Sequence, residues 1–248
     1  MENSLNVKEN NSEIGTVRMA LRDGSPIGIG YFAVSFAFGI FATGTGLGVL
    51  EALFISMFNL TSAGQIAAVP IIAASGSFIE LALTQLVINA RYLLMSISMS
   101  QSLGKSVKMA DKFVIAFSLT DEMYAVSTSK GGMLSRKYLY SLIILPYLGW
   151  TMGTLFGALA GNILPKSVVS ALGIAIYGMF IAIVVPAMKQ SRMVTLSVFI
   201  AIALSLSFKY APFLNKVPSG FSIIICAVVS SLIAATIDVS KKRQRGNR

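Results

Sequence analysis

Arg91 is the residue whose chemistry most needs an explanation. It lies near the middle of an apolar stretch, Phe78 to Met99, that is long enough to cross a bilayer and contains one other charge, Glu80. A guanidinium does not lose its proton, so at membrane depth it needs a charged partner or a water-filled cavity. Arg91 is therefore a candidate for holding a carboxylate, which belongs either to a substrate or to the protein.

Two adjacent carboxylates, Asp121 and Glu122, are candidate partners for Arg91. An anionic substrate that displaced a carboxylate from Arg91 would change the proton affinity of that carboxylate, so substrate release would be coupled to protonation. The predicted proton carriers are Asp121, Glu122 and Glu80. The alternative is a permanent structural ion pair between Arg91 and Asp121 or Glu122.

Polar side chains in the same half of the chain are candidate substrate ligands. Gln85 and Asn89 lie four positions apart, on the helical stripe next to that of Arg91. Amides both donate and accept hydrogen bonds, which suits a zwitterion as well as it suits helix association. The predicted substrate-binding residues are Arg91, Asn89, Gln65, Gly64, Ser62, Thr61 and Gln85. An apolar pocket is expected to draw on Phe36, Met57, Phe58 or Leu60.

Membrane helices must position these residues. Hydrophobic residues make up 55% of the 248 residues, charged residues 12%, and the mean hydropathy is +0.75, which together predict an all-α polytopic integral membrane protein. The net charge of +10 comes from Lys and Arg clustered between apolar runs, so nucleic-acid binding is not expected. With one cysteine, Cys226, and no histidine, neither a metal nor another cofactor is expected, and enzymatic catalysis is not expected either.

Eight apolar runs predict about seven to eight transmembrane helices. They lie between a polar N-terminal segment, residues 1–25, and a basic tail, residues 239–248, so the transport domain is residues 26–238. Basic residues near both termini predict that both ends of the chain lie in the cytoplasm. The expected location is a bacterial plasma membrane. The runs are Ile27–Ala42, Val49–Ala74, Phe78–Met99, Phe113–Val126, Tyr138–Ile163, Val168–Met188, Met193–Phe208 and Phe221–Ile237.

The first half does not fit a series of simple crossings. Three such crossings would leave Lys105, Lys108 and Lys112 outside, against the positive-inside rule. The run Val49–Ala74 has polar interruptions, and Phe113–Val126 is short, which predicts broken or re-entrant segments of the kind that mark transport sites. An ordinary eight-crossing bundle with one mildly basic outer loop is the alternative.

Glycines predict how the helices pack. Gly149, Gly153, Gly157 and Gly161 recur every fourth position and so line one face of a helix that another helix can approach closely. The string Phe38-Gly39-x-x-Ala42 is echoed by Phe156-Gly157-x-x-Ala160, which is too weak a match to establish an internal repeat.

Four motifs in a fixed order carry a family resemblance. They are Gly64-Gln65-x-Ala67 after the string Asn59-Leu60-Thr61-Ser62, then Asn89-x-Arg91, then Thr120-Asp121-Glu122, and then Trp150-x-x-Gly153-Thr154-x-x-Gly157. Together they resemble the AzlC family of membrane proteins, implicated in branched-chain amino acid export, from about Ser25 to the last crossing. The resemblance implies an amino acid exporter that works with a small AzlD-like membrane subunit.

Secondary transport driven by a proton or ion gradient is the expected mechanism, because the chain carries no nucleotide-hydrolysing motif. Gly104-Lys105-Ser106 ends like a phosphate-binding loop, but Met99 stands where that loop requires a glycine. The expected partners are the amino acid, the small subunit and the lipid bilayer. The alternatives are a channel-like pore for a small solute and a non-transporting subunit of a larger permease.

Overall fold

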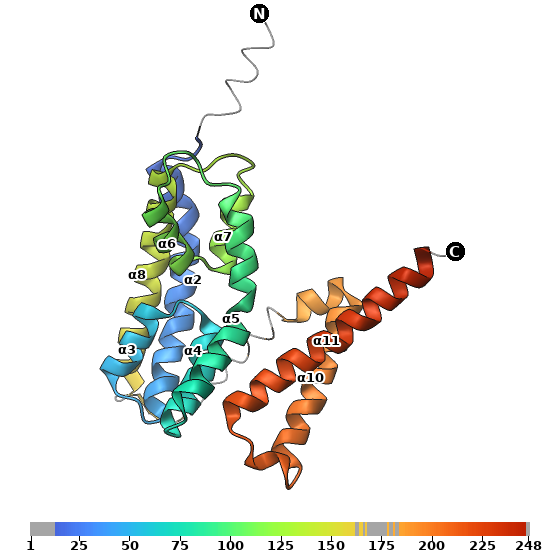
Figure 1. Ribbon diagram of the computed structural model, residues 1–248. Coiled ribbons are helices and arrows are strands. Elements are labelled where there is room, and N and C mark those ends of the chain that lie inside the picture. Colours follow the sequence, from blue (N-terminus) through green and yellow to red (C-terminus); the bar gives the residue numbers. More distant parts are fainter. Residues whose placement is uncertain are drawn as a thin grey trace, which may run out of the picture.

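The structure is a computed structural model that describes residues 13–161, 164–165, 167, 178, 181 and 184–246. Its named elements in this part of the chain are all helical, which confirms the predicted class. Five segments are long and apolar enough to cross a membrane (Figure 1): α2 (Val17–Gly44), α5 (Phe78–Ser100), α8 (Arg136–Gly161), α10 (Arg192–Tyr210), and Ser219–Val239 within α11 (Ser219–Gly246).

The predicted number of crossings is not established by these helices. The apolar run Val168–Met188 lies mostly outside the described residues. Helix α2 begins at Val17, within the segment predicted as a polar N-terminal tail.

The apolar run Val49–Ala74 is broken, as predicted. Helix α3 (Val49–Phe58) ends at a stretch in which Asn59 has φ −140° and ψ 103°, an extended conformation, and α4 (Ser62–Ala73) begins three residues later. With 10 and 12 residues, neither helix reaches the ~20 residues that a crossing needs.

The run Phe113–Val126 is also broken, in the middle of a second pair of short helices. Helix α6 (Met109–Ser118) and α7 (Asp121–Thr128) contain 10 and 8 residues. Leu119 and Thr120 between them are extended, with ψ angles of 120° and 170°. The carboxylates of Asp121 and Glu122 therefore lie in the first turn of a helix, where the helix dipole favours negative charge.

Hydrogen bonds between loops show that both pairs are re-entrant. Ile14 N–H donates to Met133 O (2.7 Å) and Leu134 N–H donates to Ser102 O (2.8 Å), so α2 starts and α5 ends at the same end of the bundle. The α6–α7 pair follows α5 and precedes these loop residues, so it enters from that end and returns to it. The α3–α4 pair connects the other ends of α2 and α5, and enters from the opposite end (Figure 1).

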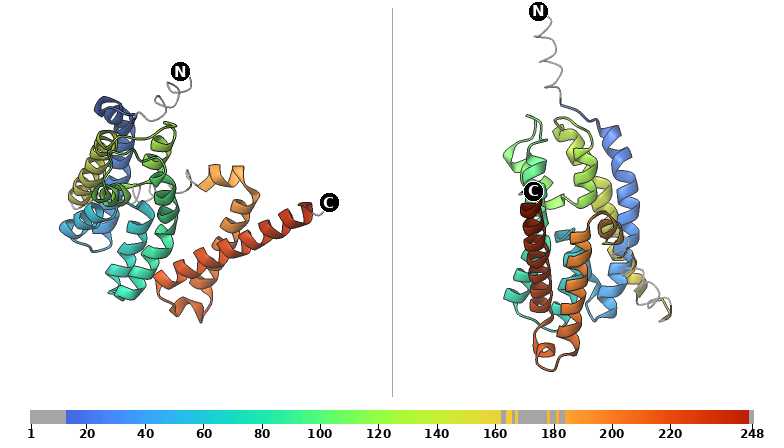
Figure 2. Two further views of the ribbon diagram at one scale, coloured as in Figure 1. Left: turned by 45° about the horizontal axis from the view of Figure 1, so that its top comes forward. Right: turned by 90° about the vertical axis from the view of Figure 1, so that its right-hand side faces the viewer.

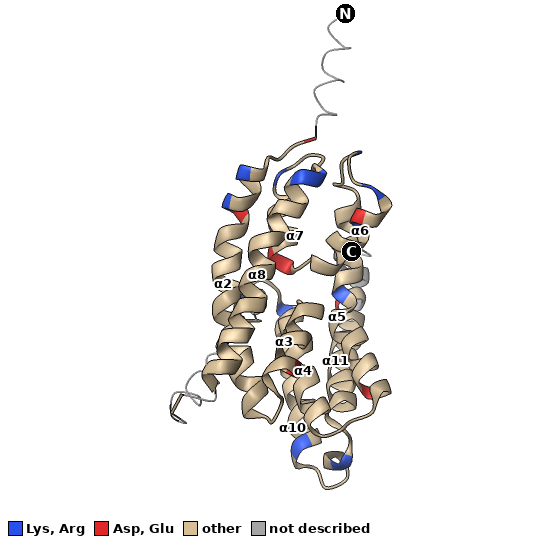
Figure 3. Ribbon diagram, turned by 90° about the vertical axis from the view of Figure 1, so that its left-hand side faces the viewer, with Lys and Arg blue, Asp and Glu red and all other residues tan. Residues whose placement is uncertain are grey.

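We call the end where α2 starts the basic end, because Lys and Arg residues gather there (Figure 3). They are Arg18, Arg22, Lys105, Lys108, Lys112, Lys130, Arg136 and Lys137. The lysines before and within α6 thus share one end with Arg18 and Arg22 in the first turns of α2, which removes the conflict with the positive-inside rule. Of the two alternatives, the structure favours re-entrant segments over the eight-crossing bundle.

Polar contacts fasten the loops at the basic end. Ser106 donates two hydrogen bonds to the Glu13 carboxylate, from its hydroxyl and from its backbone N–H (2.5 Å), and these bonds lower the pKa of Glu13. Asp111 accepts from Tyr140 and pairs with Arg136 at 2.9 Å.

The two re-entrant pairs have similar breaks. Phe58-Asn59-Leu60-Thr61 at the first break matches Phe117-Ser118-Leu119-Thr120 at the second, and α3 and α6 have the same length of 10 residues. Helix α2 with α3–α4 and helix α5 with α6–α7 run in opposite directions, an arrangement that inverted-topology transporters also have.

Helices α2 and α8 pack closely along the predicted glycine face. A Cβ at Gly157 would lie 2.7 Å from the carbonyl carbon of Phe36, and one at Gly149 would lie 3.1 Å from Cα of Gly28. From the other side, a Cβ at Gly28 would lie 2.7 Å from the carbonyl oxygen of Leu145. The prediction of a close helix approach is confirmed. Helices α10 and α11 lie side by side, and α11 contacts α5 and α4 (Figures 1 and 2).

Candidate functional site

Both breaks border one cavity of about 760 Å³. The N-terminal ends of α4 and α7 both lie on its wall, so the positive ends of two helix dipoles are near the same space. The lining residues are Pro26, Ile27, Gly30, Tyr31, Val34, Leu60, Ser62, Ala63, Ile88, Arg91, Tyr92, Thr120, Asp121, Glu122, Trp150 and Val184.

Arg91 pairs with Asp121 on this wall. Its guanidinium lies 2.9 Å from Asp121 Oδ2, and the two side chains are 46% and 47% exposed. The guanidinium also donates to the Tyr92 hydroxyl (3.1 Å) and lies 4.9 Å from the centre of the Tyr92 ring. Of the two predicted carboxylates, Asp121 is thus the one that forms an ion pair with Arg91.

Glu122 has a different partner, Tyr31 of α2. The Tyr31 hydroxyl lies 2.5 Å from Glu122 Oε2 and 2.6 Å from the Thr120 hydroxyl. Since Thr120 Oγ1 also accepts from the Met123 N–H, its own proton is free to go to Tyr31, and the Tyr31 proton goes to Glu122. Tyr31 packs edge-on against Trp150 of α8 (5.1 Å between ring centres), so α2, α7 and α8 meet at this point.

The predicted amides lie behind the cavity wall rather than on it. Gln85 Oε1 accepts from Asn59 (3.3 Å) and Asn89 (3.1 Å), and its Nε2 donates to Gly64 O (2.9 Å). A Cβ at Gly64 would lie 2.6 Å from Gln85 Oε1, so a larger residue there would displace the Gln85 amide. These contacts hold α5 against the α3–α4 break.

Gln65 is buried and joins three helices. Its Nε2 donates to Ser56 of α3 (2.8 Å), and the Ser56 hydroxyl bonds to Thr154 of α8 (2.6 Å). Thr61 donates to Asn59 Oδ1 (2.7 Å), whereas Ser62 lies on the cavity wall. Of the predicted substrate ligands, Arg91 and Ser62 therefore line the cavity and the others support it.

Glu80 lies elsewhere. Its carboxylate accepts a hydrogen bond from the backbone N–H of Gly220 (2.7 Å), at the start of α11, and the side chain is buried. Glu80 and Arg91 are eleven positions apart in α5, which corresponds to a rise of ~16 Å along the helix. Glu80 therefore attaches α11 to α5 and does not contact the Arg91–Asp121 pair.

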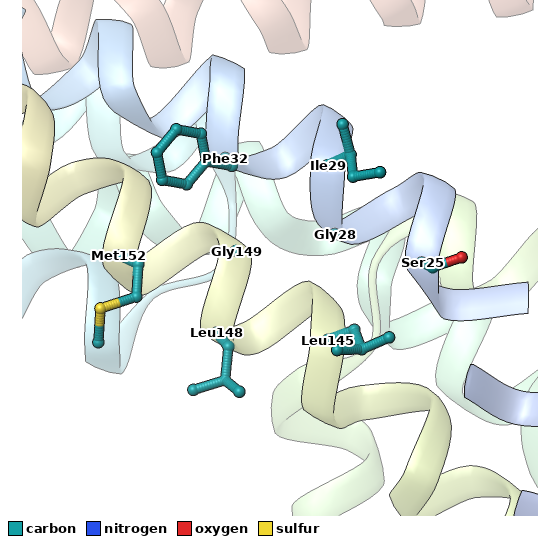
Figure 4. Close-up of a pocket in the computed structure, with 8 residues that line it drawn as sticks. All are labelled: Ser25, Gly28, Ile29, Phe32, Leu145, Leu148, Gly149 and Met152. Carbon is teal, nitrogen blue, oxygen red and sulfur yellow. The ribbon is translucent and has the colours of Figure 1, made fainter. Parts of the chain in front are cut away.

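A second hollow, of about 410 Å³, lies between α2 and α8 (Figure 4). Apart from Ser25, its lining is apolar: Gly28, Ile29, Phe32, Leu145, Leu148, Gly149 and Met152. It borders the close contact of Gly28 with Gly149, and none of the charged residues discussed above lines it.

The sequence matches the family described as AzlC protein over residues 26–164, more than half of the chain. The chain belongs to the AzlC family. The match includes both breaks and every cavity residue named above except Val184. It is therefore a membrane-embedded protein of a family associated with membrane transport.

Named relatives agree with this assignment. The chain is 30% identical to the inner membrane protein YgaZ of Escherichia coli over 191 residues, which are 73% of this chain and 78% of that protein. It is 31% identical to a membrane protein of Archaeoglobus fulgidus over 66% of this chain and 72% of the relative. No solved structure matches this AzlC-family chain.

Three aromatic residues of the site were not predicted: Tyr31, Tyr92 and Trp150. A tyrosine or tryptophan in an apolar run is typical of packing, so composition gave no signal. Trp150 did lie in one of the motifs shared with the AzlC family. Of the expected pocket residues, only Leu60 lines the cavity, while Phe58 is 71% exposed.

Proposed function

We propose that this AzlC-family protein exports branched-chain or related apolar amino acids by proton- or ion-coupled secondary transport. The observation that carries the proposal is the Arg91–Asp121 ion pair, half-exposed on the wall of a cavity between two interrupted helices. Charges at membrane depth and discontinuous helices are both typical of substrate and ion pathways. Ile27, Val34 and Leu60 supply apolar wall for an aliphatic side chain.

The proposal assigns coupling to Asp121 and Glu122. Protonation of Asp121 removes its charge from the pair with Arg91, and protonation of Glu122 removes its charge from the short contact with Tyr31. Either event weakens a contact that holds α7 in place. Glu80 is not among the proposed coupling residues, because its carboxylate contacts Gly220 of α11 and not the α7 residues.

The proposal also places the protein in a bacterial plasma membrane, with the basic end in the cytoplasm. Lys and Arg are enriched in cytoplasmic loops, and the eight such residues named above are at the basic end. A small AzlD-like membrane subunit is included as a partner on the family resemblance.

Uptake into proteoliposomes tests the proposal. The full chain, with and without a co-expressed small subunit, is reconstituted, and uptake of radiolabelled leucine, isoleucine and valine is followed with and without an imposed pH gradient. Accumulation against a concentration gradient is expected, and a channel-like pore cannot produce it. Absence of flux under all these conditions would reject the transporter.

The Arg136–Asp111 pair offers a matched control for the site. Both ion pairs have a 2.9 Å contact and arginines of nearly equal exposure, 46% and 47%, but Arg136 lies at the basic end, outside the cavity. Arg91→Ala and Asp121→Asn should abolish transport, whereas Arg136→Ala should retain it. Wild-type flux in a correctly inserted Arg91→Ala variant would show that the cavity is not the transport site.

A further inference from the structure

The charged wall of the cavity has more negative than positive groups. Arg91 faces Asp121 and Glu122, and its guanidinium is already bonded to Asp121 and to the Tyr92 hydroxyl. A substrate carboxylate placed there would be a third anion beside a single cation. A substrate ammonium would instead compensate the excess carboxylate, so this wall suits the amino group of an amino acid.

Another part of the wall is the start of α4, where a helix presents backbone donors. Helix α4 starts at Ser62, and its N-cap Thr61 forms no side-chain capping bond; the Thr61 hydroxyl donates instead to Asn59 Oδ1. The first amides of a helix have no acceptor within the helix, and Ser62 and Ala63 lie on the cavity wall. By contrast, the hydroxyl of Thr120 caps α7.

Trp150 contributes a side-chain donor in the same region. Its side chain lines the same cavity, it is 2% exposed, and its indole N–H has no hydrogen-bond partner in the part of the chain that the structure describes. It belongs to one apolar cluster with Leu60, two residues before α4 begins. A buried donor without an acceptor is costly, so an anionic ligand group beside it would be favoured.

We infer that the cavity binds a zwitterion in a fixed orientation, with the ammonium group at Asp121 and Glu122 and the carboxylate at the start of α4 beside the Trp150 N–H. This inference rests on the proposed function and names the polarity of the same site. The aliphatic side chain then lies against Ile27, Val34 and Leu60. Arg91 holds Asp121 in position and does not bind the substrate carboxylate.

Three probes separate the two ends of the substrate: leucine, leucine methyl ester, which keeps the ammonium, and N-acetyl-leucine, which keeps the carboxylate. Their dissociation constants are measured by calorimetry on the full chain, together with the small subunit if wild-type binding requires it. The wild type should bind leucine about tenfold or more tightly than either derivative, since each lacks one charged contact.

Two variants then assign the ends. Glu122→Gln should weaken leucine and the methyl ester by about tenfold and leave N-acetyl-leucine unchanged. Trp150→Phe should weaken leucine and N-acetyl-leucine and leave the methyl ester unchanged. Tyr147→Phe removes another donor of α8, one that bonds to Met57 O outside the cavity, and should change none of the three.

The reverse pattern, or equal changes for all three probes in both variants, would overturn the assigned orientation. If Trp150→Phe does not fold, the Glu122→Gln series still decides the ammonium end. A wild type that binds no leucine rejects the proposed function itself, so the two failures are distinguishable.

Discussion

Gly157→Ala tests the close approach of α2 and α8, on which the cavity depends because these helices carry Tyr31 and Trp150. The added Cβ would lie 2.7 Å from the carbonyl carbon and 2.9 Å from Cα of Phe36. Unbonded carbon atoms pack at ~3.5–4.0 Å, so α8 would have to move from α2 by roughly 1 Å. The neighbours are backbone atoms, which cannot rotate away.

Overpacking of this kind costs ~1–3 kcal/mol. For a chain of this size, a loss of 1 kcal/mol lowers the melting temperature by about 2–4 °C, so a decrease of roughly 2–12 °C is expected. Trp150, the chain's one tryptophan, lies on α8 against Tyr31, and its fluorescence reports unfolding of this contact in detergent.

Gly30→Ala is the matched control, because it is also within a membrane helix and a Cβ there would have no atom within 4 Å. Both variants gain the same helix propensity, so their difference isolates the helix contact. Equal melting temperatures for Gly157→Ala and Gly30→Ala would refute the close approach.

Three further outcomes are expected. With Cys226→Ala as background, Lys105→Cys should react with a membrane-impermeant thiol reagent only from the cytoplasmic side; labelling from outside would contradict the re-entrant pair. Gln85→Leu removes three hydrogen bonds and should cost ~1–3 kcal/mol, seen as a lower melting temperature without loss of insertion. Glu13→Gln should raise hydrogen exchange at the Ser106 amide. Because bonding lowers the pKa of Glu13 from 4.5, the stabilisation is present above pH 4.5, and the difference from wild type should vanish as pH falls through the lowered value.

The broken segments could be predicted from the sequence because each has a local cause. Asn59 and Thr61 interrupt an apolar run, and the Phe113–Val126 run is too short to cross. The directions of the segments could not be predicted, since charge bias alone allowed two arrangements. Long-range hydrogen bonds such as Leu134 to Ser102 decide between them, and such pairings leave no pattern in the sequence.

The sequence predicted the charged residues of the candidate site but not the aromatic residues that line the cavity. Arg91 and Asp121 are conspicuous because charge is costly at membrane depth. Gln85 and Asn89 have the same chemistry whether they bind a substrate or a neighbouring helix, and only the contact with Gly64 shows which they do here. Tyr31 lies 91 residues from Glu122 in sequence, so no spacing rule could have paired them.

The contacts that hold the two re-entrant pairs differ in kind, although the breaks in the two pairs are similar. Neutral hydrogen bonds hold α3–α4, through Gln85 and through Gln65 with Ser56. Contacts to carboxylates hold α7, through Arg91 with Asp121 and Tyr31 with Glu122. Protonation therefore weakens the attachment of one pair and leaves the other unchanged. If Asp121 and Glu122 carry the proton as proposed, its uptake in the cavity would loosen the pair that enters from the basic end and not the other, so the two protonation states would differ in how firmly α7 is held.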